Sequence, residues 1–137
     1  MATIDTVEAL SRVPLLSGLA PKELEKLASS FTERAFPAGT VVVKQGDERG
    51  IGFFVITDGT ARVSADGQSV DVLGPGDHFG EIALIGDRIR TATVTAETDL
   101  HTLVTSVWEF RGFVKNDPDV AWKLLEHLAR LLHEARQ

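Results

Sequence analysis

The chain has 137 residues, of which 43% are hydrophobic and 25% are charged, a composition typical of a folded globular domain. This length predicts a single domain, residues 1–137, with one hydrophobic core. The net charge of −6 disfavours a broad nucleic-acid interface, because such binding neutralises many phosphates with lysine and arginine. The absence of cysteine excludes disulfides, iron–sulfur clusters, cysteine nucleophiles and thiolate zinc sites.

The N-terminal quarter of the chain, residues 1–33, is predicted to form helices. The segment VEALSRV is followed by a Pro-Leu-Leu-Ser-Gly turn and then by PKELEKLASSF, in which Pro21 suits a first helical position. The apolar residues of this second helix share one face, namely Leu24, Leu27, Ala28 and Phe31. Asp5 and the lack of a basic-then-apolar order argue against a secretory signal, and no apolar run approaches about 18 residues. We therefore expect a cytoplasmic protein with no membrane segment.

Residues 34–105 show short β-type runs that are separated by glycine turns. The runs are TVVVKQGD, GFFVITDG, ARVSADG, QSVDVLGPGD and TATVTAETDLHTLVT. Asp66-Gly67 is a hairpin signal, and Gly59, Gly74 and Gly76 mark further breaks. A strand roughly every ten residues predicts a mainly β fold with flanking helices, either an all-β barrel or a double-sheet jelly roll.

Residues 106–137 return to helical periodicity. Asp117 is expected to cap the last helix, with Pro118 at its first position. Two apolar stripes follow, the first through Val120, Leu124, Leu128 and Leu131 and the second through Ala121, Leu125 and Leu132. This apolar face is wide enough to touch both the barrel and another surface. Trp108 and Trp122 are interpreted as residues that anchor the helices.

The stretch HFGEIALIGDRIRTATV, residues 78–94, places two opposite charges, Glu81 and Arg90, among apolar residues. A short helix beginning near Gly80 would direct free backbone N–H groups at an anion, and glycine would allow close approach. Arg90 could add a bidentate contact to a phosphate. Glu81 would accept hydrogen bonds from ribose hydroxyls instead, since a carboxylate repels a phosphate. The alternative is a structural ion pair with no ligand.

The run Phe79-Gly80-Glu81-Ile82-Ala83-Leu84, with Arg90-Thr91-Ala92-Thr93-Val94 after it, resembles the phosphate-binding cassette of the cyclic nucleotide-binding domain family. That family includes protein kinase A regulatory subunits and bacterial catabolite activator proteins. The segment VVVKQGDERGIGFFVITDG, residues 41–59, is similar to its early glycine-rich signature. The resemblance implies an eight-stranded double-stranded β-helix, or jelly-roll β-barrel, with N-terminal helices and C-terminal lid helices.

The resemblance also implies a set of ligand-binding residues: Phe79, Gly80, Glu81, Ile82, Ala83, Arg90, Thr91, Ala92 and Val63. Backbone N–H groups of Gly80, Ile82 and Ala83 would meet the phosphate. Glu81 would hold the ribose 2′-hydroxyl and Arg90 an exocyclic phosphate oxygen. Thr91 and Ala92 would lie close to phosphate and base within cassette 79–92, and Val63 would pack against the ligand.

The sequence determines neither which base is bound nor which residue covers it. Thr91 stands at a position that differs between cyclic AMP and cyclic GMP binders of the family, so the ligand is cyclic AMP or cyclic GMP. The family's last helix covers the purine, and four residues are candidates for that contact: Leu128, Arg130, Leu131 and His133. Ligand would be reported through a change in the packing of this helix.

No enzyme is predicted. His78, His101, His127 and His133 lack metal-ligand spacing, which disfavours a metal-dependent cupin-like enzyme, and no catalytic triad or carboxylate pair stands out. We therefore expect no metal and no cofactor. The chain shows no recognition helix after the lid, so no DNA binding is expected from this chain alone. An effector domain or protein is a candidate partner through the C-terminal helix, as is a second copy in a homodimer. The alternatives are a sensor fragment of a transcription regulator and a family member that has lost nucleotide binding.

Overall fold

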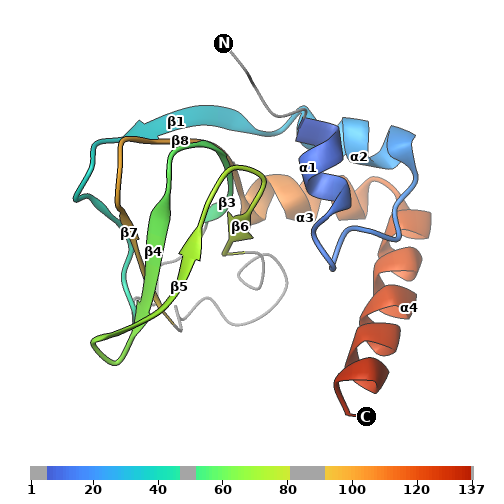
Figure 1. The fold of residues 1–137 in the computed structure, drawn as a ribbon. Coiled ribbons are helices and arrows are strands. Elements are labelled where there is room, and N and C mark those ends of the chain that lie inside the picture. Colours follow the sequence, from blue (N-terminus) through green and yellow to red (C-terminus); the bar gives the residue numbers. More distant parts are fainter. Residues whose placement is uncertain (1–5, 47–51, 81–91, 137) are drawn as a thin grey trace.

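The computed structural model describes residues 6–46, 52–80 and 92–136. These residues form two four-stranded antiparallel sheets, called the roll below, with helices at both ends (Figure 1). The strands are β1 (Thr32–Phe36), β2 (Val41–Val43), β3 (Gly52–Asp58), β4 (Ala61–Ala65), β5 (Gln68–Leu73), β6 (His78–Phe79), β7 (Thr93–Ala96) and β8 (Leu100–Ser106). The helices are α1 (Thr6–Ser11), α2 (Pro21–Ala28), α3 (Val107–Lys115) and α4 (Pro118–Ala135). The predicted mainly β fold with flanking helices is confirmed.

The chain passes repeatedly between the two sheets, as expected for a jelly roll, and only β4 and β5 follow one another within one sheet. One sheet has the order β1-β8-β3-β6 and the other has the order β2-β7-β4-β5. The predicted Asp66-Gly67 hairpin joins β4 to β5, and both residues have positive φ, 53° and 79°. Two consecutive positive φ angles are the signature of a type I′ turn, whose twist suits a two-residue hairpin.

Strand β3 is buried on both of its faces and separates two hydrophobic cores. Phe53 and Val55 belong to one core, while Phe54 and Ile56 belong to the other, as the alternation of a strand requires. The first, called the helical core, contains Ala9, Leu10, Val13, Leu15, Leu16, Leu19, Leu24, Leu27, Phe53, Val55, Phe110, Val120 and Leu124. The second, called the roll core, contains Phe36, Phe54, Ile56, Ala61, Phe79, Val94, Ala96 and Leu100. The single core expected from chain length is therefore divided in two.

Helix α2 ends earlier than the apolar spacing predicts. The hydroxyls of Ser29 and Ser30 donate hydrogen bonds to the carbonyls of Lys26 and Leu27, at 2.7 and 2.8 Å. Such local bonds compete with helical hydrogen bonding. Phe31 lies beyond the helix end and packs edge-on against Phe53, with 5.8 Å between ring centroids. The prediction that Phe31 lies on the helix was wrong, although its contribution to the apolar packing was right.

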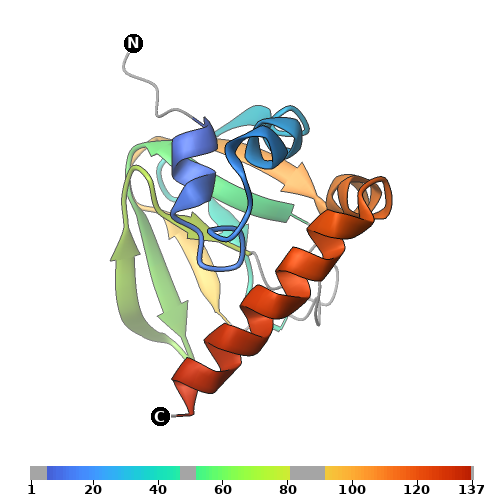
Figure 2. The same ribbon diagram turned by 90° about the vertical axis from the view of Figure 1, so that its right-hand side faces the viewer.

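Helix α4 starts as predicted. The Asp117 side chain accepts a hydrogen bond from the Asp119 N–H at 3.1 Å, and Pro118 takes the first helical position. Val120 and Leu124 are buried in the helical core. The helix lies at the end of the molecule away from β2 and β7, and it runs from the end of α3 down beside the roll to the C-terminus (Figures 1 and 2).

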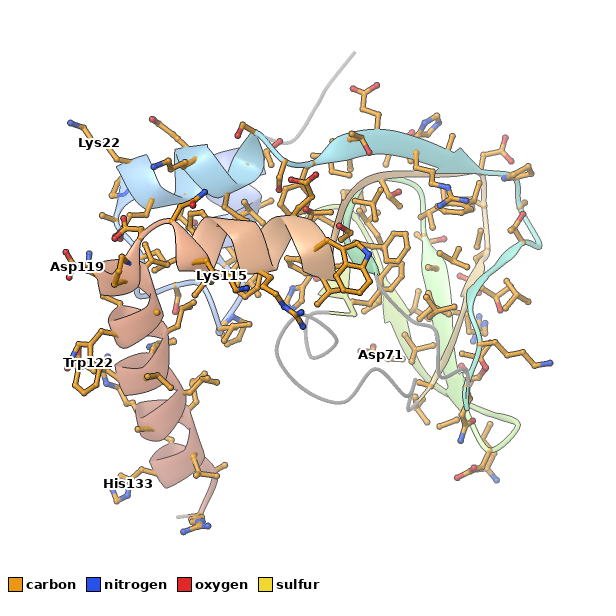
Figure 3. The ribbon with its side chains drawn as sticks, turned by 180° about the vertical axis from the view of Figure 1, so that it is seen from behind. Lys22, Asp71, Lys115, Asp119, Trp122 and His133 are labelled. Atoms are coloured by element: carbon orange, nitrogen blue, oxygen red, sulfur yellow. The ribbon has the colours of Figure 1, made fainter. Side chains whose placement is uncertain are left out.

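The two tryptophans do not anchor their helices. Trp108 is 55% exposed and Trp122 is 63% exposed, because each lies on the helix face opposite the buried residues, such as Phe110 in α3 and Leu124 in α4. Figure 3 shows Trp122 projecting from α4 on the side away from the sheets. The interpretation of both residues as anchors was therefore wrong. On α4, Trp122 shares its exposed face with Leu125 and Leu132, which are also more than half exposed.

Candidate functional site

The predicted cassette connects the two sheets of the roll. It follows β6, which pairs with β3 in one sheet, and it precedes β7, which pairs with β2 and β4 in the other sheet. The described residues at its two ends are Phe79 and Gly80 on one side and Ala92 on the other. The two described ends of the cassette therefore lie at different sheets of the roll.

Phe79 fixes the first end of the cassette. It pairs with Phe54 in the β3–β6 register, and the two rings stack with centroids 4.7 Å apart and an interplanar angle of 12°. The Phe79 side chain is buried in the roll core. It positions Gly80, whose φ of +88° falls in the region that glycine adopts without steric penalty. A glycine is therefore required here by the backbone itself, besides the close approach expected for an anion.

Ala92 marks the other end, where the chain enters β7. Ala92 is half-buried, and the hydroxyl of the adjacent Thr93 accepts a hydrogen bond from the Gln45 N–H at 2.9 Å. The Gln45 side chain forms two hydrogen bonds with Asp66, one to the carboxylate at 3.0 Å and one from the N–H at 2.8 Å. Gln45 thus ties the β4–β5 hairpin to the entrance of β7. Sequence analysis missed this role, because a single glutamine carries no pattern.

Val63 lies on the same side of its sheet as the roll core, with which it packs. Its register partners are Val94 on β7 and Asp71 on β5. Side chains directly opposite one another in a ladder share a face of the sheet. Asp71 is exposed, and the register places it on the face of Val63, beside the predicted ligand position. Its carboxylate accepts a hydrogen bond from the Val72 N–H at 2.8 Å.

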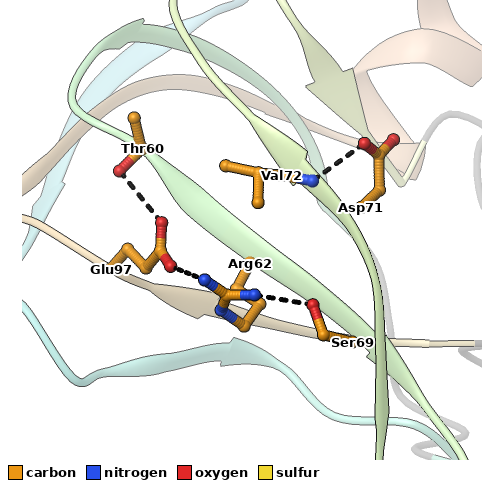
Figure 4. Close-up of polar contacts among 6 residues, drawn as sticks. All are labelled: Thr60, Arg62, Ser69, Asp71, Val72 and Glu97. Carbon is orange, nitrogen blue, oxygen red and sulfur yellow. Dashed lines mark hydrogen bonds and ion pairs between the residues drawn. The ribbon is translucent and has the colours of Figure 1, made fainter.

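The opposite face of this sheet carries a separate polar network. Arg62 forms an ion pair with Glu97 and donates a hydrogen bond to the Ser69 hydroxyl at 2.7 Å (Figure 4). The Thr60 hydroxyl donates to the same Glu97 carboxylate at 3.4 Å. The network connects β4, β5 and the end of β7 on the solvent side. Arg62 is thus a paired structural charge and not a competing candidate for an anion in the roll.

Several predicted site residues lie outside the described part of the chain. They are Glu81, Ile82, Ala83, Arg90 and Thr91, together with the short helix expected to begin near Gly80. The structure therefore brings together Val63, Phe79, Gly80 and Ala92 as the frame of the site. The roles of the two charged residues stay predictions.

Among residues 6–46, 52–80 and 92–136, no group of three or more His, Asp or Glu side chains could hold a metal ion. Within the same ranges, no helix combines the length and apolar character needed to cross a bilayer.

Taken together, the fold and the frame define a jelly-roll ligand-binding domain whose cassette joins two sheets. The family model described as "Cyclic nucleotide-binding domain" matches residues 33–117. The chain therefore belongs to the cyclic nucleotide-binding domain family.

Individual relatives agree with this assignment. The chain is 44% identical over 93 residues to a cAMP-dependent protein kinase regulatory subunit of Yarrowia lipolytica, covering 66% of this chain and 24% of that protein. It is 32% identical over 127 residues to the Cyclic AMP receptor protein of Thermus thermophilus, covering 89% of this chain and 58% of the receptor. The N-terminal domain of a transcriptional regulator from Streptomyces coelicolor superimposes with a TM-score of 0.82 at 28% identity, covering 93% and 92% of the two chains. The chain thus spans about a quarter of the kinase subunit and over half of the receptor.

Proposed function

We propose that residues 1–137 act as one cytoplasmic sensor domain that binds cyclic AMP or cyclic GMP and performs no chemistry on it. The observation that supports this most is the cassette sequence, residues 79–92, framed by two sheets and a buried Phe79. In this proposal Gly80, Ile82 and Ala83 present N–H groups to the phosphate. Glu81 holds the ribose hydroxyl and Arg90 the phosphate, while Val63, Thr91 and Ala92 line the remainder of the site.

Calorimetric titration tests the proposal directly. Cyclic AMP, cyclic GMP and linear AMP are titrated into the full chain, and we expect one cyclic nucleotide to bind with a 1:1 stoichiometry. Linear AMP should bind more weakly, because its second phosphate charge and open ring do not match one arginine and a row of N–H groups. A ligand that binds only the native state also raises the melting temperature. No heat and no thermal shift with either cyclic nucleotide would favour the alternative of a family member that has lost binding.

The second element of the proposal is that α4 reports the ligand by covering the base. The predicted lid residues Leu128, Arg130, Leu131 and His133 all lie on the C-terminal half of this helix. Removing residues after Leu125 should weaken cyclic nucleotide binding, because the base would stay in contact with water. Circular dichroism should show that the roll is still folded. Equal affinity of the truncated and full chains would mean that the helix serves stability or association instead.

An exposed apolar stripe on α4 supports the proposal that this sensor binds a partner. Trp122, Leu125 and Leu132 expose 63%, 58% and 56% of their surface on one face of the helix. Neighbouring exposed apolar side chains of this kind mark interaction surfaces. An effector domain or protein, or a second copy of the chain, would cover this stripe, and sedimentation of the purified chain separates the two. We assign no DNA binding to this chain by itself.

A further inference from the structure

Four of the described strands form the edges of the two sheets: β1 and β6 in one sheet, and β2 and β5 in the other. Strands β2 and β6 have three and two residues, which is too short to pair well with a further strand, and β1 presents the charges of Glu33 and Arg34. Strand β5 has six residues, of which Val70 and Val72 are 61% and 48% exposed. An edge of this length with apolar side chains pairs with another chain unless something prevents it.

One side of β5 pairs with β4, and no described strand pairs with its other side, called the open edge below. In Figure 2, β5 (yellow-green) lies at the margin of the molecule. The register with β4 skips Val70, because Asp71 pairs with Val63 and Ser69 with Ser64. A bulge of this kind twists a strand, which by itself hinders pairing but leaves the open edge accessible.

Asp71 places a fixed charge in the middle of this edge. Its carboxylate accepts a hydrogen bond from the Val72 N–H at 2.8 Å, and Figure 4 shows the carboxylate on the side of β5 away from β4. The bond therefore occupies an N–H group that an added strand would need. An added strand would also take water away from the carboxylate, and an unpaired charge that loses its water is strongly destabilising.

The sequence of β5 makes a second copy of the same strand the partner that fits the open edge. In an antiparallel pair of two copies, one register places Val70 of each copy opposite Val72 of the other, on both sides of Asp71. Apolar β-branched residues are favourable cross-strand partners. The same register places Asp71 directly opposite Asp71 of the second copy, where like charges repel. The two valines thus favour self-pairing of β5, and Asp71 opposes it.

We infer that Asp71 keeps the open edge of β5 closed to a second copy of the chain, which is the partner that this edge otherwise binds. The inference goes beyond the proposed function and does not depend on it, because no step involves a nucleotide. It predicts that replacement of Asp71 by an apolar residue allows self-association. It also predicts that replacement by a cation creates a partner for the wild-type chain.

Sedimentation velocity of the full chain tests the first effect. Asp71→Val removes the charge and frees the Val72 N–H, so this variant should self-associate at least about ten-fold more tightly than the wild type. Asp71→Asn keeps the shape and an acceptor oxygen, and its effect should be smaller. Glu25→Gln is the charge-matched control, because it neutralises an exposed carboxylate on α2. It should associate no more than the wild type.

A charge exchange tests which residues meet. Asp71→Lys alone should not pair at this edge, because two lysines repel each other as two aspartates do. An equimolar mixture of Asp71→Lys and the wild type should associate at least about ten-fold more tightly than either protein alone, since opposite charges then face each other. Hydrogen exchange locates the contact, because pairing at the open edge slows the exchange of the β5 amides.

The mixture decides the question even if Asp71→Val folds poorly. Association of the mixture with slower exchange in β5 supports the inference. A mixture that associates no more than its separate components overturns it, and shows that the bulge alone closes the edge. Association without slower exchange in β5 also overturns it and indicates another surface, such as the exposed apolar stripe of α4. Wild-type chains that already pair through β5 would contradict the role assigned to Asp71. Each of these outcomes leaves the proposed nucleotide binding standing.

Discussion

Replacement of Arg90 by alanine is expected to weaken cyclic nucleotide binding about ten- to a hundred-fold. In the proposed site the guanidinium makes a charge-assisted hydrogen bond to the phosphate, which contributes on the order of 1.5–3 kcal/mol. Glu81→Gln should have a smaller effect, because an amide oxygen still accepts a hydrogen bond from the ribose hydroxyl. Titration calorimetry of the two variants and the wild type measures both changes.

Arg62→Ala is the control for this prediction. Arg62 carries the same charge on the same domain, but its partners are Glu97 and Ser69 on the solvent side of the sheet. Its loss should leave the affinity unchanged. If Arg90 and Glu81 instead formed a structural ion pair, either variant would lose roughly 3–5 kcal/mol of stability. Thermal melts without ligand would then show the variants far below the wild type, contrary to the sensor proposal.

The largest expected effect on stability comes from Gly59→Ala. Gly59 joins β3 to β4 with a φ of +88°, and a Cβ at this position would lie 2.2 Å from the Asp99 carbonyl oxygen and 2.9 Å from the Thr98 hydroxyl. The backbone of Asp99 cannot move aside as a flexible side chain could. Adding the cost of a left-handed conformation to that of overpacking gives a loss of about 2–5 kcal/mol in the free energy of unfolding.

Gly67→Ala separates these two contributions. Gly67 also has a positive φ, +79°, but no heavy atom lies within 4 Å of an added Cβ. Only the conformational cost of about 1–2 kcal/mol should remain. Urea denaturation of the wild type and both variants, fitted with a common m-value, compares their free energies of unfolding. Equal losses would show that the close approach to Asp99 relaxes at little cost.

The sequence predicts those features of the fold that depend on local chemistry. Glycine turns at a spacing of about ten residues indicate the roll, Asp66-Gly67 indicates the hairpin, and Asp117-Pro118 indicates the start of α4. Each of these signals acts within a few residues of the feature that it predicts. The family resemblance adds the cassette, which composition and periodicity do not supply.

Features that depend on distant partners were not predicted. The apolar face of α4 predicts that the helix packs against the rest of the domain. It does not predict that the buried residues of α4 join the helical core instead of the roll core. Strand β6 has two residues, which is too short to show any periodicity. Gln45 and Asp71 take their places from strand register, which brings together residues that are far apart in the sequence.

The two-sided burial of β3 also bears on how this domain folds. In most strands a shift by one residue would expose apolar side chains, so the alternation itself fixes the register. In β3 both faces are apolar, and a one-residue slip would exchange Phe53 and Val55 for Phe54 and Ile56 with little loss of burial. Register must instead be set at the strand ends. At Gly52 a Cβ would come within 2.9 Å of the Phe54 ring, and the pairing with β8 is irregular between Ile56 and Asp58. We therefore expect misregistered β3–β8 pairs to be the main kinetic traps during refolding. The rate at which the chain corrects this register should depend on the two ends of β3, at Gly52 and at Ile56–Asp58.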